Sequence, residues 1–90
     1  MKLEQAQTIA LKILTFLVSD SSRAEAFLRV TGMDPEDLRQ GAVDNAFLAG
    51  IVDYLLTDET LIIAFSEDEK LRPESIIAVR RALPGGEIDF

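Results

Sequence analysis

The chain has 90 residues; nine are Lys or Arg and sixteen are Asp or Glu, which gives a formal net charge of −7. It contains no His and no Cys, which excludes His general bases, thiol nucleophiles, Cys/His zinc sites and disulfides. An acidic chain without a basic stripe is also a poor nucleic-acid binder, because phosphate contacts need several Lys and Arg side chains. With 48% hydrophobic and 28% charged residues, it is expected to be one soluble globular domain.

The N-terminal residues give no sign of a targeting or membrane segment. The apolar runs at 13–14 and 16–18 are separated by Thr15, and no run there exceeds three residues. They are too short and too interrupted for a signal peptide or a membrane helix. We therefore expect a cytoplasmic protein with neither a membrane nor a nucleic acid as partner.

The first predicted helix is expected to lie at the centre of the fold. Apolar residues recur at helical spacing from Leu3 to Leu17, and their arc is wider than a surface helix usually shows. The opposite, polar face consists of Glu4, Thr8, Lys12 and Thr15.

Two shorter helices are predicted to follow. Asp20 or Ser22 caps the second helix, and Gly32 is a plausible left-handed stop. The dipeptide 34–35 (Asp-Pro) opens the third, because Asp is a good N-cap and Pro suits the first helical position. Gly41 ends it.

Three more helices complete the chain. Asp44 caps a fourth helix that continues through Leu56, and Asp58 caps a fifth that runs from Glu59 to about Ser66. Pro73 opens a sixth. The chain is therefore predicted to be all-α, a compact bundle of about six short helices in a single domain over residues 1–84.

The C-terminal residues 85–90 are expected to form a flexible tail. Residues 84–86 (Pro-Gly-Gly) stop the sixth helix. Residues 88–90 (Ile-Asp-Phe) end the chain with an apolar-acidic-apolar pattern, which strand-adding peptides can show. Three residues are weak evidence for that mode, so a tail folded on its own core or a loose end is favoured.

An internal repeat is the most informative pattern. A shift of 38 residues places residues 9–38 on 47–76 without a gap. Seven of the thirty positions are then identical, whereas composition alone would give about two. Phe27 meets Phe65, and Asp20 meets Asp58. We interpret the halves as two three-helix pseudo-repeats packed about a pseudo-twofold axis through the first and fourth helices. The alternative is two unrelated units that share common capping chemistry.

The fifth helix is predicted to have apolar residues on all sides. Leu61, Ile62 and Ile63 follow one another and are continued by Ala64 and Phe65. Such a helix must be covered all round, which is difficult in a domain this small. Either the sixth helix and the N-terminal helix cover it, or a partner or second subunit does; one of the two Ile residues is then expected to be exposed.

Three acids come where this helix is expected to end. Glu67, Asp68 and Glu69 oppose the helix dipole there, and breaks of a local rule often lie at functional sites. They form either an acidic patch for a basic partner or a divalent cation, or a solvated loop after a helix that ends by Ser66. No calcium-hand ligand pattern is present.

Gly50 stands in the middle of the fourth helix. Glycine costs about 0.5–1 kcal/mol relative to Ala in that position. Either another backbone approaches closely there, or the position is exposed and the glycine is a neutral substitution without a structural role.

Three segments resemble a known family: residues 28–39 (LRVTGMDPEDLR), 53–59 (DYLLTDE) and 80–86 (RRALPGG). Together they look like a family of small, uncharacterised alphaproteobacterial all-helical proteins, a domain of unknown function, over about residues 3–86. The resemblance implies a compact, stand-alone bacterial helical protein. It implies no activity, cofactor or catalytic residue.

The sequence thus predicts a non-enzymatic, acidic protein-interaction module, with no catalytic, cofactor-binding or metal residues. The candidate interaction residues are Leu61, Ile62, Ile63, Glu67, Asp68 and Glu69. One alternative is a self-associating, homodimeric structural domain. A more distant one is an enzyme that uses carboxylates alone, although the acids at 34, 36 and 37 are explained by helix capping.

Overall fold

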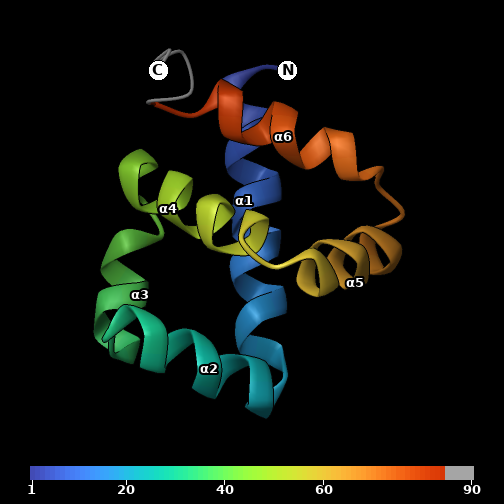
Figure 1. Cartoon of the computed structure of the whole chain (residues 1–90). Helices are drawn as coiled ribbons and strands as arrows, with labels where there is room; N and C mark the ends of the chain where they lie inside the picture. The colour runs from blue at the N-terminus through green and yellow to red at the C-terminus, as the bar shows by residue number, and fades with distance from the viewer. Residues whose placement is uncertain (85–90) are drawn as a thin grey trace.

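The computed structural model describes residues 1–84, which fold into six α-helices (Figure 1). Their bounds are α1 Leu3–Ser19, α2 Ser21–Thr31, α3 Pro35–Gly41, α4 Asn45–Leu56, α5 Glu59–Glu69 and α6 Pro73–Ala82. No strand occurs within this part of the chain, so the predicted all-α class is confirmed. The predicted tail, 85–90, lies outside the described residues.

Helix α1 runs through the middle of the bundle, and α4 crosses it (Figure 1). It packs against α2, α4 and α6, which explains the wide apolar arc of its sequence. Ala6 and Ala10 are fully buried on it, and such small side chains let neighbouring helices approach closely. Ile13 and Leu17 continue the same buried face.

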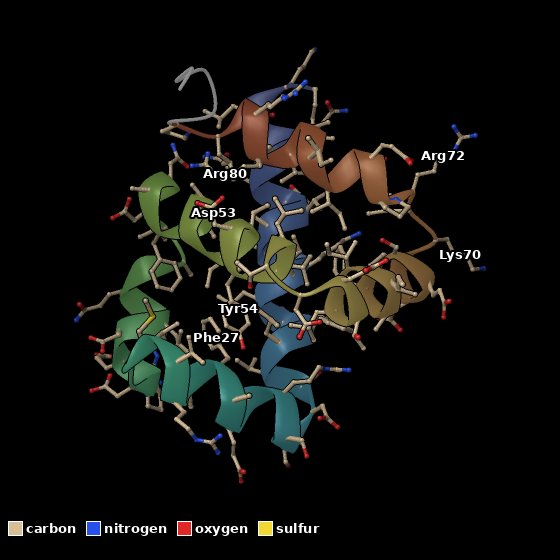
Figure 2. The ribbon with its side chains drawn as sticks, in the orientation of Figure 1. Phe27, Asp53, Tyr54, Lys70, Arg72 and Arg80 are labelled. Atoms are coloured by element: carbon tan, nitrogen blue, oxygen red, sulfur yellow. The ribbon has the colours of Figure 1, made fainter. Side chains whose placement is uncertain are left out.

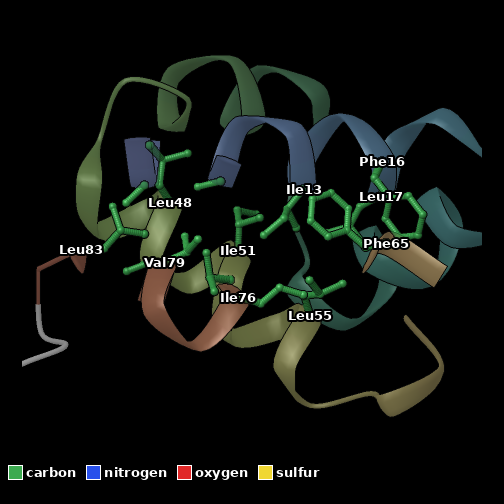
Figure 3. Close-up of a cluster of buried hydrophobic side chains, with 14 of the residues drawn as sticks. Ile13, Phe16, Leu17, Leu48, Ile51, Leu55, Phe65, Ile76, Val79 and Leu83 are labelled. Atoms are coloured by element: carbon green, nitrogen blue, oxygen red, sulfur yellow. The ribbon is translucent and has the colours of Figure 1, made fainter. Parts of the chain in front are cut away.

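One contiguous core lies between α1, α4 and α6 and extends to α2 and α5 (Figure 3). Its largest fully buried side chains are Phe27, Phe65, Ile13, Leu17, Leu48, Ile51, Leu55, Ile76 and Leu83. Every helix except α3 contributes at least one large apolar side chain to it, so the described residues form one folded body rather than two.

Aspartates begin four of the helices. The Asp20 carboxylate accepts a hydrogen bond from the backbone N–H of Arg23 at 3.0 Å, so Asp20 rather than Ser22 is the cap of α2. Asp34, Asp44 and Asp58 cap α3, α4 and α5 in the same way. These caps satisfy N–H groups that have no partner within the helix.

The C-terminal end of α5 differs from the prediction. The helix continues to Glu69, three residues beyond the expected end at Ser66. Lys70 then adopts the left-handed conformation, with φ 55°, and the N–H of Leu71 donates to the carbonyl oxygen of Ser66 at 2.9 Å. This is a Schellman-type end, for which Gly is the usual residue. The solvated-loop interpretation of the three acids is therefore wrong, because they form the last turn of a helix.

Several features of the two halves are offset by 38 residues, as the predicted pseudo-repeat requires. Helices α2 (21–31) and α5 (59–69) begin and end at positions 38 apart. The left-handed residues that end them, Gly32 and Lys70, have the same offset, as do Gln7 and Asn45, whose side chains join α1 to α4 by a hydrogen bond of 2.6 Å. Superposition of the halves remains a prediction.

In the described part of the chain, no helix combines the length and the apolar character needed to cross a membrane.

Candidate functional site

The apolar candidate residues of α5 do not share one surface. Leu61 and Ile62 are half-buried and pack against the core, so the fold itself covers much of both. Ile63 is 47% exposed, as expected for one of the two Ile residues. Its neighbours one turn away on α5 are Glu59 and Glu67, both exposed, so Ile63 is an isolated apolar side chain on a polar face and does not form a patch by itself.

The acidic candidates divide between two faces. Glu67 lies on the exposed face of α5 beside Ile63. Asp68 and Glu69 line an open groove of about 380 Å³ between the end of α5 and the outer face of α1. The structure therefore places two of the three acids beside the central helix, where α1 contributes the rest of the lining.

The floor of this α1/α5 groove is apolar and firmly held. Leu11 is 39% exposed and lines the groove together with the accessible edge of Phe16. The Phe16 ring is fixed on two sides: the Arg23 guanidinium lies 3.9 Å from its centroid, and Phe65 packs edge-on against it at 5.4 Å. A cation over an aromatic face and an edge-to-face ring pair both add to simple burial.

The hydroxyl groups of α1 face the groove as hydrogen-bond acceptors. Thr8 donates its hydroxyl to the carbonyl oxygen of Glu4, and Thr15 donates to that of Leu11, each at 3.0 Å. Their protons are committed to their own helix, so their oxygen lone pairs remain for a visiting donor. Both threonines line the groove. Its polar lining is consequently rich in acceptors.

The charge of the groove is negative. Helix α5 carries four acids and no basic residue, and its carbonyl end adds the negative pole of the helix dipole. Of the described residues that line the groove, Lys12 carries the one positive charge. Its Nζ is 4.0 Å from the Glu69 carboxylate, and its side chain is half exposed. An exposed pair at this distance is weak, so Lys12 offsets only part of the charge.

The sequence did not single out the α1 half of this groove. It places Thr8, Lys12 and Thr15 on the polar face opposite the apolar arc of the first helix. The signal that could have revealed it is Leu11, an exposed apolar residue within that polar face. Leu11 becomes informative only when the fold brings the end of α5 beside α1, because the two segments are more than fifty residues apart.

Other candidate positions have structural explanations. Asp34 and Asp37 form a reciprocal capping box at the start of α3, and Glu36 pairs with Arg39 at 3.5 Å. A Cβ added at Gly50 would meet no atom within 4 Å, so no backbone of the described chain approaches it. Among residues 1–84 there is no group of three or more Asp, Glu, His or Cys side chains placed to hold a metal ion.

The arrangement is suited to recognition of a donor-rich partner. An apolar floor, hydroxyl acceptors and carboxylates lie along one side of α1, over the three turns from Thr8 to Ser19, a length of about 17 Å. This length matches a short helix or an extended peptide of a few residues.

Comparison with known proteins identifies one family. The model of the family described as "Protein of unknown function (DUF3572)" matches residues 3–86. This confirms the resemblance to a family of unknown function; the alphaproteobacterial source stays an expectation. No curated protein and no solved structure matches the chain.

Proposed function

The chain belongs to the family of proteins of unknown function DUF3572, and we propose that it is a non-enzymatic interaction module whose α1/α5 groove binds a basic, amphipathic segment of another protein. The observation that carries this proposal is the position of Asp68 and Glu69 beside the exposed Leu11. An apolar anchor of the partner would cover Leu11, and its Lys or Arg side chains would reach the two carboxylates.

Charge complementarity favours a basic partner over other proteins. The chain has a net charge of −7, which steers cationic segments towards it and repels acidic ones. The acids at the end of α5 are unfavourable within the free helix because they oppose its dipole. A partner cation placed there relieves this repulsion, so binding and local helix stability are coupled.

The hydrogen-bonding chemistry points the same way. Lys and Arg bring several donors and no acceptor. The groove offers carboxylates and the oxygen lone pairs of Thr8 and Thr15. Each buried or half-buried donor of such a partner therefore finds an acceptor, which avoids the cost of an unpaired polar group.

The test is a binding titration with a defined probe. We would use a 15-residue helical peptide of Leu, Ala and Lys with the Lys residues along one face, labelled for fluorescence anisotropy. The expected result is saturable binding in the micromolar range that weakens as salt is added. A peptide with Glu in place of Lys should not bind. Equal binding of both peptides, or of neither, would overturn the proposal.

Matched variants locate the site. Asp68→Asn combined with Glu69→Gln should weaken binding about fivefold or more, while slightly raising the free energy of unfolding because two acids at a helix C-terminus are removed. Glu25→Gln with Glu36→Gln, two exposed acids elsewhere, changes the net charge equally and should weaken binding much less. A loss of binding that is the same in both variants would indicate non-specific charge attraction only.

A further inference from the structure

A second exposed surface lies on α6, the helix that follows α5 in the chain. Ile77 is 47% exposed and Met1 is 54% exposed, and both line one shallow hollow together with Glu74, Ala78, Arg81 and Ala82. Two exposed apolar side chains in one hollow form a contiguous patch, unlike the isolated Ile63. We call the residues Glu74, Ile77, Ala78 and Arg81 the outer face of α6.

The charges on this face are placed symmetrically. Glu74 lies in the first turn of α6 and Arg81 in the last, and the point midway between them falls between Ile77 and Ala78. Among residues 1–84 neither Glu74 nor Arg81 takes part in an ion pair. By contrast, the neighbouring Arg80 has a partner within the chain: its Nε donates to the Asp53 carboxylate on α4 at 2.6 Å (Figure 2).

From this pattern we propose that the outer face of α6 binds a second copy of the chain, with the two α6 helices antiparallel across a twofold axis. In that arrangement Glu74 faces the partner's Arg81 and Arg81 faces the partner's Glu74. Ile77 packs over the partner's Ala78, whose small side chain lets the helices approach closely. A twofold interface must be self-complementary, and this face satisfies that condition in the order of its charges and in the pairing of a large with a small apolar side chain.

The choice of a second copy over another protein rests on this complementarity. A basic partner would be repelled by Arg81, and an acidic partner would be repelled by Glu74. A second copy related by a twofold axis places an opposite charge against each of these two residues. Self-association is the alternative function that the sequence left open. The charge pattern places its interface on α6 instead of on α5.

The dimer is expected to be weak. Helix α6 has ten residues and is roughly 15 Å long, so its outer face buries less than the about 800 Å² per partner of a standard interface. The net charge of −7 on each copy opposes association further, although salt screens this repulsion. The concentration range of any test must therefore extend to about millimolar, since an affinity of that order corresponds to few contacts.

The experiment is sedimentation velocity of the full chain over a concentration series in about 0.15 M salt. The wild type should pass from monomer to dimer. Glu74→Arg alone and Arg81→Glu alone each place two like-charged pairs in the dimer and should raise its dissociation constant about tenfold or more. The double variant restores opposite charges across the axis and should return to within about twofold of wild type.

A control pair makes the same charge changes on α3. Glu36→Arg and Arg39→Glu alter an exposed pair within one helix. They should change the dissociation constant of the dimer only through their effect on the net charge of the chain. A wild type that stays monomeric at millimolar concentration, or a double variant as weak as the single ones, would overturn the proposal.

A measurement on the wild type alone covers the case in which the variants do not fold. Backbone amide shifts should change with concentration on α6 and stay constant on α3. Concentration-dependent shifts centred on any other helix would overturn the proposal. The α1/α5 groove lies on another surface, so peptide binding there stands or falls independently of this result.

Discussion

The ring of Phe27 on α2 packs edge-on against Tyr54 on α4, with ring centroids 5.0 Å apart and planes at 79° (Figure 2). Its counterpart joins α5 to α1: Phe65 packs edge-on against Phe16, at 5.4 Å and 73° (Figure 3). A shift of 38 residues carries Phe27 onto Phe65 and Phe16 onto Tyr54. Each pair therefore corresponds to the other with the two halves exchanged, as expected for packing about a twofold axis.

The first prediction follows from these pairs. Phe27→Ala and Phe65→Ala should each lower the free energy of unfolding by about 3–5 kcal/mol, because both rings are fully buried. Urea denaturation measures both, and Val43→Ala, at an exposed loop position, is the control. A nearly neutral change at one Phe and unfolding at the other would show that the two positions are not equivalent.

The residues that end α2 and α5 give a second prediction: substitutions at these two positions should change the free energy of unfolding in opposite directions. Lys70 holds a left-handed conformation that costs a non-glycine residue about 1–2 kcal/mol, so Lys70→Gly should raise the free energy of unfolding by about 1 kcal/mol. Gly32→Ala should lower it by a similar amount, since its φ is 70° and no atom lies within 4 Å of an added Cβ. Thermal and urea unfolding measure both; equal signs would contradict this explanation.

Substitution of two other glycines by Ala should change the stability of the protein in opposite directions, because the space around them differs. Gly50 is exposed within α4 with open space around it, so Gly50→Ala should stabilise the protein by about 0.5–1 kcal/mol. Gly41 is buried, and a Cβ there would collide with the ring of Phe47. Gly41→Ala should therefore destabilise by about 1–3 kcal/mol. Destabilisation by Gly50→Ala would instead support the alternative interpretation, in which another backbone approaches closely at that position.

The two neighbouring Ile residues of α5 provide a fourth prediction. Ile63→Lys should preserve the fold, because the new cation points to solvent between Glu59 and Glu67, each four residues away. Ile62→Lys should destabilise strongly, because Ile62 packs against the core and a charge there loses its hydration. Circular dichroism and urea denaturation distinguish the two.

The same pair also reports on self-association. Ile63→Lys should leave the dimer of the α6 face unchanged when measured by sedimentation. Loss of the dimer in this variant would place the interface on α5, contrary to the location proposed above.

The sequence predicted the helices well because their start signals are local. Asp34 with Pro35 and Asp58 before Glu59 are patterns that act within one turn, and the structure places caps at both. The end of α5 was missed because Lys70 stands where Gly is usual, and left-handed geometry at Lys is set by the fold rather than by propensity. Ser66, the expected end of this helix, is instead buried within it, and its hydroxyl has no hydrogen-bond partner in the described chain.

The candidate site was predicted only in part for a similar reason. Asp68 and Glu69 were singled out because they break the helix-dipole rule within α5 itself. Leu11 and Thr15 join them through tertiary packing, which no local pattern encodes. The Asp53–Arg80 ion pair between α4 and α6, with partners 27 residues apart, was missed for the same reason.

The most direct test of the proposed function is the position of the binding surface in solution. Backbone amide shifts should be recorded while the Lys-containing helical peptide is titrated into the protein. Binding in the α1/α5 groove predicts the largest changes at Thr8, Leu11, Lys12 and Thr15 on α1 and at Asp68 and Glu69 on α5, with small changes on α3 despite its acids. Largest changes on α3, or changes spread over every exposed acid, would contradict a defined groove.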